Sequence, residues 1–217
     1  MSATPPIITI DGPAGSGKGT IASMVAKKLA WHLLDSGAIY RIAAYAALQN
    51  HMDLSDERGL VQLIQGLNME FSGEQVLCDG EDVSLAIRTP ECAEATSKIS
   101  ALPAVRAALL ERQRSFHKLP GLVADGRDMG TVVFPDASVK IFLTASPSVR
   151  AERRYNQLRQ QGISASIGQL EREINIRDER DSNRPVAPLK PATDAWVIDS
   201  SYLSPNDVLE QILHRLR

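Results

Sequence analysis

A glycine-rich segment near the start of the chain limits the possible folds most. Residues 7–20 read IITIDGPAGSGKGT: a β-branched apolar run, four glycines and a lysine, with the apolar spacing of a helix directly afterwards. Glycines let backbone N–H groups approach an anion without a Cβ in the way, and the positive end of the following helix attracts the same charge. A turn needed for geometry alone would not require all these residues. The segment therefore predicts a strand, a phosphate-binding loop (P-loop) and a helix.

The end of this loop departs from the usual pattern, G-x-x-x-x-G-K-[ST]. Residues 12–18 satisfy it, and Lys18 would place a positive charge toward the β- and γ-phosphates of a nucleotide. The next residue is Gly19 instead of Ser or Thr, and Thr20 follows. The hydroxyl that usually binds Mg²⁺ is therefore missing from its place. The G-K-G-T ending resembles that of the nucleoside-monophosphate kinases.

Composition narrows the classes of partner. The 217 residues, 43% of them hydrophobic, are enough for one substantial core with insertions or for two small domains. A net charge of −2 gives no basic excess for nucleic acid or a membrane surface. Cys78 and Cys92 have the pattern of free thiols in a reducing compartment, and neither a signal peptide nor a membrane-spanning run of about 18 apolar residues is visible. We expect a cytoplasmic monomer that acts on small molecules, with no nucleic-acid or membrane partner.

Five short apolar runs alternate with helical patterns along the chain. They lie at about residues 7–11, 32–34, 121–124, 139–144 and 196–199. Such alternation predicts a parallel sheet with helices on both faces, and strands rich in Val, Ile and Leu suit a sheet that is buried on both sides. The predicted fold class is α/β, with a five-stranded parallel sheet of the P-loop NTPase type.

The periodicity changes after a helix that we expect at about residues 55–65, with Ser55 as its N-cap. Three short strand-like runs follow, at residues 69–71, 75–78 and 83–85, separated by Ser-Gly-Glu and Asp-Gly-Glu. This spacing predicts a small antiparallel sheet. Because it interrupts the alternation of strands and helices, we expect an insertion that forms its own lobe.

Charged residues gather at the ends of two predicted strands. Asp125, Arg127 and Asp128 follow an apolar run, and a strand that ends in Asp is a weak sign of a carboxylate that holds a metal or its water ligands. Arg41 lies one turn into the helix after the second strand, near the edge where parallel α/β sheets bind ligands. Arg41 could bind phosphate or could be a solvated surface residue.

The segment 150–184 contains eight arginines and no lysine. Two helices, at residues 147–161 and at about 167–181, are predicted there, and such a hairpin between two core strands is typical of a lid. Arg177, Asp181 and Arg184 would share one face if the second helix extends that far. They could form a surface network, although the exclusive use of Arg favours bidentate recognition of phosphate.

Four motifs together resemble the bacterial cytidylate kinases over residues 7 to about 189. They are IDGPAGSGKGT, LLDSGAIYR, VADGRDMGTVVFP and IRDERDSNRPVAPL. The resemblance implies the reaction ATP + CMP ⇌ ADP + CDP, with dCMP also accepted and Mg²⁺ carried with ATP. It also implies a core (1–36, 100–147 and 186–217), an insertion that binds the nucleoside monophosphate (37–99) and a lid (148–185).

The resemblance also assigns roles to residues. The ATP site corresponds to Gly12, Pro13, Ala14, Gly15, Ser16, Gly17, Lys18, Gly19 and Thr20. For CMP, the phosphate contacts are Arg41, Arg127 and Arg184, the ribose contacts Arg177 and Asp181, and the cytosine contacts Ser97, Arg106 and Asp128, with Ser36 and Asp125 beside them. Lys18, Arg127 and Arg184 are the expected catalytic residues. No direct metal ligand is expected, and Asp125 could hold Mg²⁺ through water.

The chemistry of the acceptor agrees with many arginines and no general base. A monophosphate is largely ionised at neutral pH, since its second pKa is about 6, so it needs positive charge rather than deprotonation. A kinase with a hydroxyl acceptor, such as shikimate or gluconate, is the alternative, with Asp125 or Asp128 as the base. A GTP-dependent switch would carry an N-K-x-D motif, which the sequence lacks.

Overall fold

The computed structural model describes residues 4–72, 75–160 and 162–216. These residues form two compact units. The first, called the sheet unit below, comprises the described residues of Met1–Leu34 and Phe116–Arg217, and the second unit comprises those of Asp35–Ser115. The three-part division into core, insertion and lid stays a prediction.

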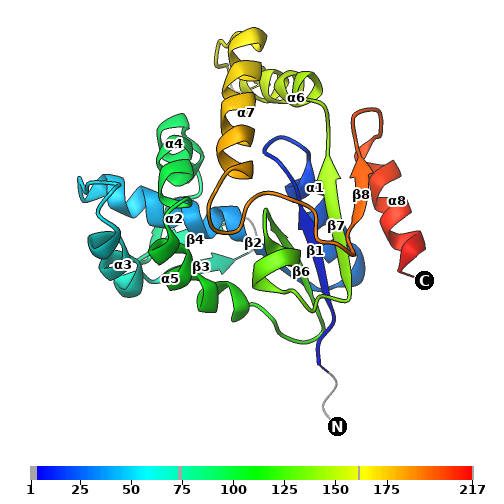
Figure 1. Ribbon diagram of the computed structural model, residues 1–217, viewed down its shortest axis with the longest axis horizontal. Coiled ribbons are helices and arrows are strands. Elements are labelled where there is room, and N and C mark those ends of the chain that lie inside the picture. The colour runs from blue at the N-terminus through cyan, green and yellow to red at the C-terminus, as the bar shows by residue number, and fades with distance from the viewer. Residues whose placement is uncertain (1–3, 73–74, 161, 217) are drawn as a thin grey trace. The chain divides into compact units, whose positions relative to one another are not determined.

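A five-stranded parallel sheet lies at the centre of the sheet unit, which confirms the predicted fold class (Figure 1). Its strand order is β2-β6-β1-β7-β8. The strands are β1 (Ile7–Asp11), β2 (His32–Asp35), β6 (Leu122–Gly126), β7 (Val139–Thr144) and β8 (Trp196–Asp199). Every residue of β1 is buried, as expected for a central strand with neighbours on both edges.

Alternate side chains of β1 point to opposite faces of the sheet, and helical turns cover both. Ile8 and Ile10 pack with residues of α1 (Lys18–Leu29) and α8 (Pro205–Arg215). On the other face, the hydroxyl of Thr9 lies 2.8 Å from where a Cβ on Gly130 would stand. Gly130 belongs to η2, a short π-helix at Met129–Val133.

Two helices between β7 and β8 form the predicted hairpin (Figure 1). They are α6 (Pro147–Gln160) and α7 (Ile167–Ser182), and Ala151, Leu158 and Leu170 form a small apolar core between them. The backbone N–H of Val149 donates to the Ser146 hydroxyl at the start of α6. Because α7 ends at Ser182, Arg184 lies beyond the helix rather than on its face.

The second unit consists of four α-helices, a 3₁₀ turn and a three-stranded antiparallel sheet within its described residues. The helices are α2 (Ser36–Gln49), α3 (Glu57–Gly66), α4 (Pro90–Ile99) and α5 (Pro103–Arg114). The strands are β3 (Met69–Ser72), β4 (Gln75–Cys78) and β5 (Glu81–Asp82), and η1 is at Ala86–Arg88.

Two local predictions in this unit were wrong. The third strand lies at Glu81–Asp82 instead of 83–85, because the Asp82 carboxylate accepts from the backbone N–H and the hydroxyl of Ser84 and turns the chain there. The N-cap of α3 is Asp56, which accepts from the backbone N–H of Gly59, instead of Ser55. The Ser55 hydroxyl donates to Asp53, so it is not used as a cap.

Candidate active site

The P-loop has a backbone that requires glycine. A Cβ on Gly12 would lie 2.0 Å from the carbonyl oxygen of Leu143, and Gly15 and Gly17 have φ values of +78° and +90°. α1 begins at Lys18, and no side chain caps its first turn in the described structure. The N–H groups of that turn therefore lack helical acceptors and can bind an anion, which is the arrangement that phosphate-binding loops use.

The carbonyl groups of the same loop have protein donors. The Lys18 ammonium donates to the carbonyl of Pro13 at 3.2 Å. From α6, Arg150 Nη1 donates to the carbonyl of Ala14 (3.1 Å) and Arg153 Nη1 to that of Ser16 (3.2 Å). These three loop carbonyls, which would repel a phosphate, therefore face cations.

Sequence reasoning gave Arg150 and Arg153 no individual role. Their spacing of three residues puts them on one helix face, but this spacing alone does not show what they contact. Ser200, just after β8, was missed entirely. Its hydroxyl lies 3.1 Å from the Ser16 carbonyl and accepts from Arg153 Nη1, so it completes the support behind the loop.

Strand register places the second charged motif beside the P-loop. In the pairing of β1 with β6, Ile10 is opposite Asp125 and Asp11 is opposite Gly126. The loop after Asp11 and the residues after Gly126 therefore leave the sheet at the same edge. The Asp125 carboxylate is buried, and its Oδ2 would lie 3.1 Å from a Cβ on Gly19.

Asp11 is a buried carboxylate that the sequence reasoning also missed. Its two oxygens each accept a 2.8 Å hydrogen bond, one from the backbone N–H of Met129 and one from that of Gly130. Burial raises the pKa of Asp11 to about 7, because its cost for the charged form outweighs these hydrogen bonds; Asp128 raises the pKa further and Lys18 lowers it. Asp11 thereby fixes the backbone that directly follows Asp128.

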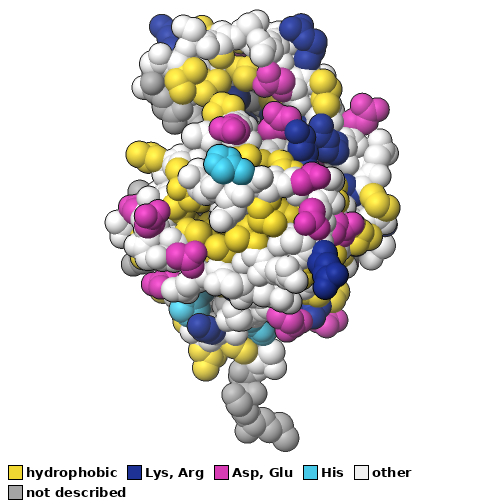
Figure 2. Space-filling view, turned by 90° about the vertical axis from the view of Figure 1, so that its left-hand side faces the viewer, with side chains coloured by type: hydrophobic (Ala, Val, Ile, Leu, Met, Phe, Trp, Pro, Cys, Tyr) yellow, Lys and Arg dark blue, Asp and Glu magenta, His cyan; other side chains and the backbone are white. Residues whose placement is uncertain are grey.

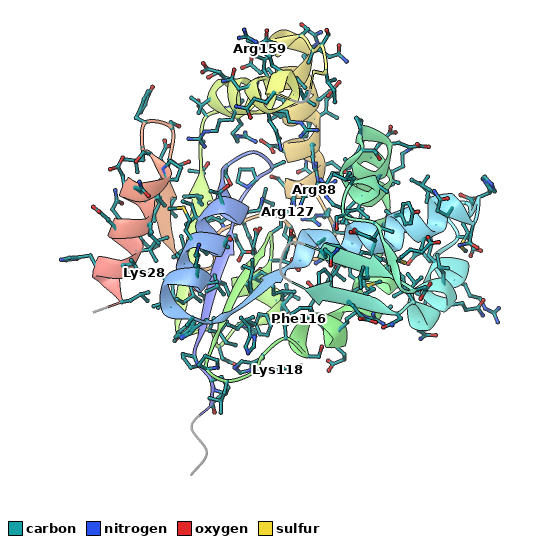
Figure 3. All side chains as sticks on the ribbon, turned by 180° about the vertical axis from the view of Figure 1, so that it is seen from behind. Lys28, Arg88, Phe116, Lys118, Arg127 and Arg159 are labelled. Carbon is teal, nitrogen blue, oxygen red and sulfur yellow. The ribbon has the colours of Figure 1, made fainter. Side chains whose placement is uncertain are left out.

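Three arginines surround Asp181 at the end of α7. Arg127 Nε donates to its Oδ2, Arg184 Nη2 lies 3.9 Å from its Oδ1, and Arg184 Nε donates to its backbone carbonyl at 3.2 Å. Burial would raise the pKa of Asp181, but the charges of Arg127, Arg184 and Arg177 outweigh it and hold that pKa below its ordinary value. Figure 3 shows Arg127 near the sheet end of α7 and Arg159 at the far end of the hairpin. Three guanidinium groups at one carboxylate place several cationic donors at this end of α7, where an anion can bind.

The remaining predicted residues lie on helices of the second unit. The Ser36 hydroxyl, at the start of α2, donates to Gln113 of α5 at 2.8 Å. Arg41 is half-buried and donates to the carbonyl of Ile87 at 2.7 Å. Ser97 of α4 and Arg106 of α5 are buried. The Arg106 guanidinium donates to the carbonyl of Ser100 and lies 5.7 Å from the centre of the Tyr40 ring.

Three other kinds of feature would indicate other functions: a basic surface patch, a metal-binding cluster and a membrane-spanning helix. On the face drawn in Figure 2, Lys and Arg side chains are mixed with Asp and Glu side chains rather than gathered in one basic patch. Among the described residues, no group of three or more His, Cys, Asp and Glu side chains is arranged to hold a metal by itself. In the same part of the chain, no helix has both the length and the apolar character needed to cross a bilayer.

Comparisons with known proteins identify relatives over the whole chain. The model of the cytidylate kinase family matches residues 8–217. A cytidylate kinase of Shewanella denitrificans is 53% identical over 223 residues, covering 100% of this chain and 98% of the relative. A cytidylate kinase of Salmonella choleraesuis is 56% identical over 221 residues, covering 100% of this chain and 97% of the relative. A solved structure, TT1252 from Thermus thermophilus, aligns with a TM-score of 0.45 and 19% identity, covering 99% of this chain and 100% of that one.

Proposed function

Because the chain belongs to the cytidylate kinase family, we propose that it transfers the γ-phosphoryl group of ATP to CMP or dCMP, giving ADP and CDP or dCDP. Family membership makes the chain an ATP-dependent nucleoside-monophosphate kinase. The P-loop and the segment DGRD (residues 125–128) leave the sheet at the same edge, and this arrangement supports the roles that we assign to individual residues. The arginine cluster at Asp181 joins them through Arg127.

We assign the ATP phosphates to the loop from Gly12 to Thr20. Its backbone N–H groups and the positive end of α1 bind the phosphate oxygens. Lys18, whose ammonium group lies at the carbonyl of Pro13, supplies the positive charge for the β- and γ-phosphates. Arg150 and Arg153 keep the loop carbonyls facing away from the phosphates.

Magnesium fits this site as an ion that arrives with ATP. Mg²⁺ commonly keeps several waters and is bound by one or two carboxylates together with substrate phosphates, so a protein cluster of three ligands is not required. The buried Asp125 carboxylate next to Gly19 is suited to accept hydrogen bonds from the waters of such an ion. When bound, Mg²⁺ supplies positive charge to the β- and γ-phosphate oxygens.

We assign the CMP phosphate to Arg127 and Arg184, with Arg41 as a third contact. Arginine binds a phosphate with two parallel hydrogen bonds, and the guanidinium groups of Arg127 and Arg184 are mostly buried, so that their charge is effective. They offset the repulsion between two anionic substrates and stabilise the charge on the transferring group. The acceptor is already ionised, so no residue has to remove a proton from it.

The nucleoside of CMP is assigned to the other predicted residues. Arg177 and Asp181 are proposed to bind the ribose, and Asp128, Ser97 and Arg106 the cytosine, with Ser36 nearby. The Asp128 side chain is buried, so its carboxylate can distinguish bases by hydrogen bonding. Cytosine has an exocyclic amine that a carboxylate accepts from, whereas uracil has a carbonyl at that position, whose oxygen repels the carboxylate.

The rival function is transfer to a hydroxyl, with Asp125 or Asp128 as the base. A coupled assay of ADP release separates the two, with CMP, dCMP, UMP, AMP, shikimate and gluconate offered in turn. We expect CMP and dCMP to give the highest kcat/KM. Equal rates with UMP or AMP would contradict the base specificity, and a faster hydroxyl acceptor would overturn the proposed reaction.

A cytoplasmic location and a monomeric state also stay predictions. Mixed surface charge is compatible with a protein that works on small molecules without a nucleic-acid or membrane partner. Light scattering coupled to gel filtration should give a mass near the chain's 23.6 kDa. A mass twice as large would contradict the monomer.

A further inference from the structure

A partly buried ion pair joins the two helices of the hairpin. Arg150 of α6 donates from Nη1 to Oδ1 of Asp178 (3.1 Å) and from Nη2 to Oδ2 (2.5 Å), so the contact is bidentate. The side chain of Arg150 is 3% exposed and that of Asp178, on α7, is 24% exposed. A bidentate contact of this kind fixes both the distance and the orientation of its partners.

The same guanidinium group contacts the P-loop. Arg150 Nη1 also donates to the carbonyl of Ala14, and its Nε donates to the carbonyl of Ala145 at 2.9 Å. A Cβ on Gly15 would lie 3.2 Å from the Cβ of Arg150, so the loop packs closely on this residue. A displacement of the loop at Ala14 therefore acts directly on Arg150, and through it on Asp178.

Asp178 is one helical turn from the residues that we assign to CMP. Asp181, three positions later on α7, accepts from Arg127, and Arg177 directly precedes Asp178. Residues three apart lie on the same side of a helix. One turn of α7 is therefore held to the P-loop through Asp178 and to the end of β6 through Asp181.

We propose that Asp178 is a positioning residue that couples occupation of the ATP loop to the affinity for CMP. ATP fixes the loop at Ala14, Arg150 passes this constraint to Asp178, and the turn of α7 that carries Arg177 and Asp181 is held in place for the acceptor. The inference rests on the proposed function. Asp178 is not assigned a substrate contact, so its effect is on the coupling between the two sites. Such a coupling is reciprocal, and factors of about 5–150 are typical.

The experiment measures the Kd of CMP by calorimetry, with and without a saturating non-hydrolysable ATP analogue that has an imido group between the β- and γ-phosphorus atoms. We expect the analogue to tighten CMP binding at least about 5-fold in the wild-type chain. In Asp178→Asn, which loses the charged bidentate contact, the factor should fall to within about 2-fold of unity. Arg150→Lys keeps the positive charge but cannot make two parallel hydrogen bonds to Asp178, so its coupling factor should also be smaller than that of the wild type.

A matched control is Asp194→Asn, which makes the same change in an exposed ion pair. Lys140 Nζ lies 2.9 Å from Asp194 Oδ2, and the Asp194 side chain is 61% exposed. This variant should keep the wild-type coupling factor. Thermal unfolding of each variant identifies any that do not fold. If Asp178→Asn does not fold, the coupling factor of Arg150→Lys tests the proposal in its place.

The outcomes separate this inference from the function on which it rests. A wild-type coupling factor near unity, or an unchanged factor in folded Asp178→Asn and Arg150→Lys, would overturn the positioning role while CMP phosphorylation by the wild type remained. Absence of CMP-dependent ADP release from the folded wild type would instead overturn the proposed function.

Discussion

Gly19 lies against the carboxylate of Asp125: a Cβ at position 19 would stand 3.1 Å from Asp125 Oδ2. The usual P-loop has Ser or Thr at this position, with a hydroxyl that binds Mg²⁺. Here the position is filled from the neighbouring strand β6 by a buried acidic side chain. The glycine therefore leaves room for Asp125, and the variant ending G-K-G-T is explained by a residue more than a hundred positions away.

We predict that Gly19→Ala and Gly19→Ser both lower kcat by about 10-fold or more. A Cβ at position 19 would force the Asp125 carboxylate to shift by a few tenths of an ångström, and the hydroxyl of Ser would crowd the same carboxylate further. Stability should not fall correspondingly, since Ala is favoured over Gly in a helix by about 0.8–1 kcal/mol. Steady-state kinetics and urea unfolding measure the two effects.

The matched control for Gly19→Ala is Gly66→Ala at the end of α3, where a Cβ would meet nothing within 4 Å. It should leave kcat unchanged. Wild-type activity in Gly19→Ser would show that Asp125 does not need this space.

A second prediction concerns the magnesium requirement. Asp125→Asn keeps the shape of the side chain but removes the charge that would hold the waters of Mg²⁺. The Mg²⁺ concentration for half-maximal activity should rise about 10-fold, whereas the KM for CMP should change less than about 3-fold. Asp136→Asn, at an exposed position, is the control. An unchanged magnesium requirement would assign the ion to other groups.

The elements of the sheet unit could be predicted because their signals are local. The run Ile7–Asp11 is apolar along its whole length, and the spacing of glycines with Lys18 defines the loop after it. The N-cap of α3 was less predictable, because Ser55 and Asp56 are adjacent and both suit the position. A hydrogen bond from the Ser55 hydroxyl to Asp53 decided between them.

The support of the site could not be predicted, because its contacts join distant parts of the chain. Asp11 binds the N–H groups of Met129 and Gly130, and Arg150 reaches back to Ala14. Each of these residues resembles an ordinary strand-end or surface residue in the sequence. Only strand order and the packing of α6 on the loop bring the partners together.

A third prediction tests base recognition. Asp128→Ala removes the acceptor that we assign to the cytosine amine, so the ratio of kcat/KM for CMP to that for UMP should fall at least about 10-fold. The KM for ATP should change less than about 3-fold, because the P-loop is unaltered. Competition between the two monophosphates in one assay gives the ratio directly. A ratio equal to that of the wild type would remove Asp128 from the base pocket.

Arg184→Ala should lower kcat by about 100-fold or more, the scale for loss of one group that stabilises charge in the transition state. Arg184→Lys should recover only part of it, because an ammonium group cannot form two parallel hydrogen bonds with phosphate. Arg172→Ala, an exposed position on α7, is the control and should retain full activity. Near-normal turnover in Arg184→Ala would make the cluster at Asp181 a structural network without a catalytic role.

The last prediction follows from the lowered pKa of Asp181. The ordinary pKa of an aspartate is 3.8. Burial raises the pKa of Asp181, but the charges of Arg127, Arg184 and Arg177 lower it by more, so the pKa in the folded chain is below the ordinary value. As the pH falls below the ordinary value, the unfolded chain binds a proton at Asp181 before the folded chain does. The contribution of this carboxylate to stability is therefore present above pH 3.8 and is lost as the pH falls through the folded-state pKa.

Asp181→Asn removes the negative charge that the three guanidinium groups face. We expect its free energy of unfolding at pH 7 to be lower than that of the wild type by about 1–3 kcal/mol. Urea unfolding of both proteins between pH 7 and pH 3 should give a constant difference above about pH 5 and a shrinking one at the acid end. A difference that grows as the pH falls would mean that Asp181 is protonated more readily in the folded chain than in the unfolded one. The arginines would then fail to outweigh the cost of burying the carboxylate, which would weaken the assignment of the CMP phosphate to this cluster.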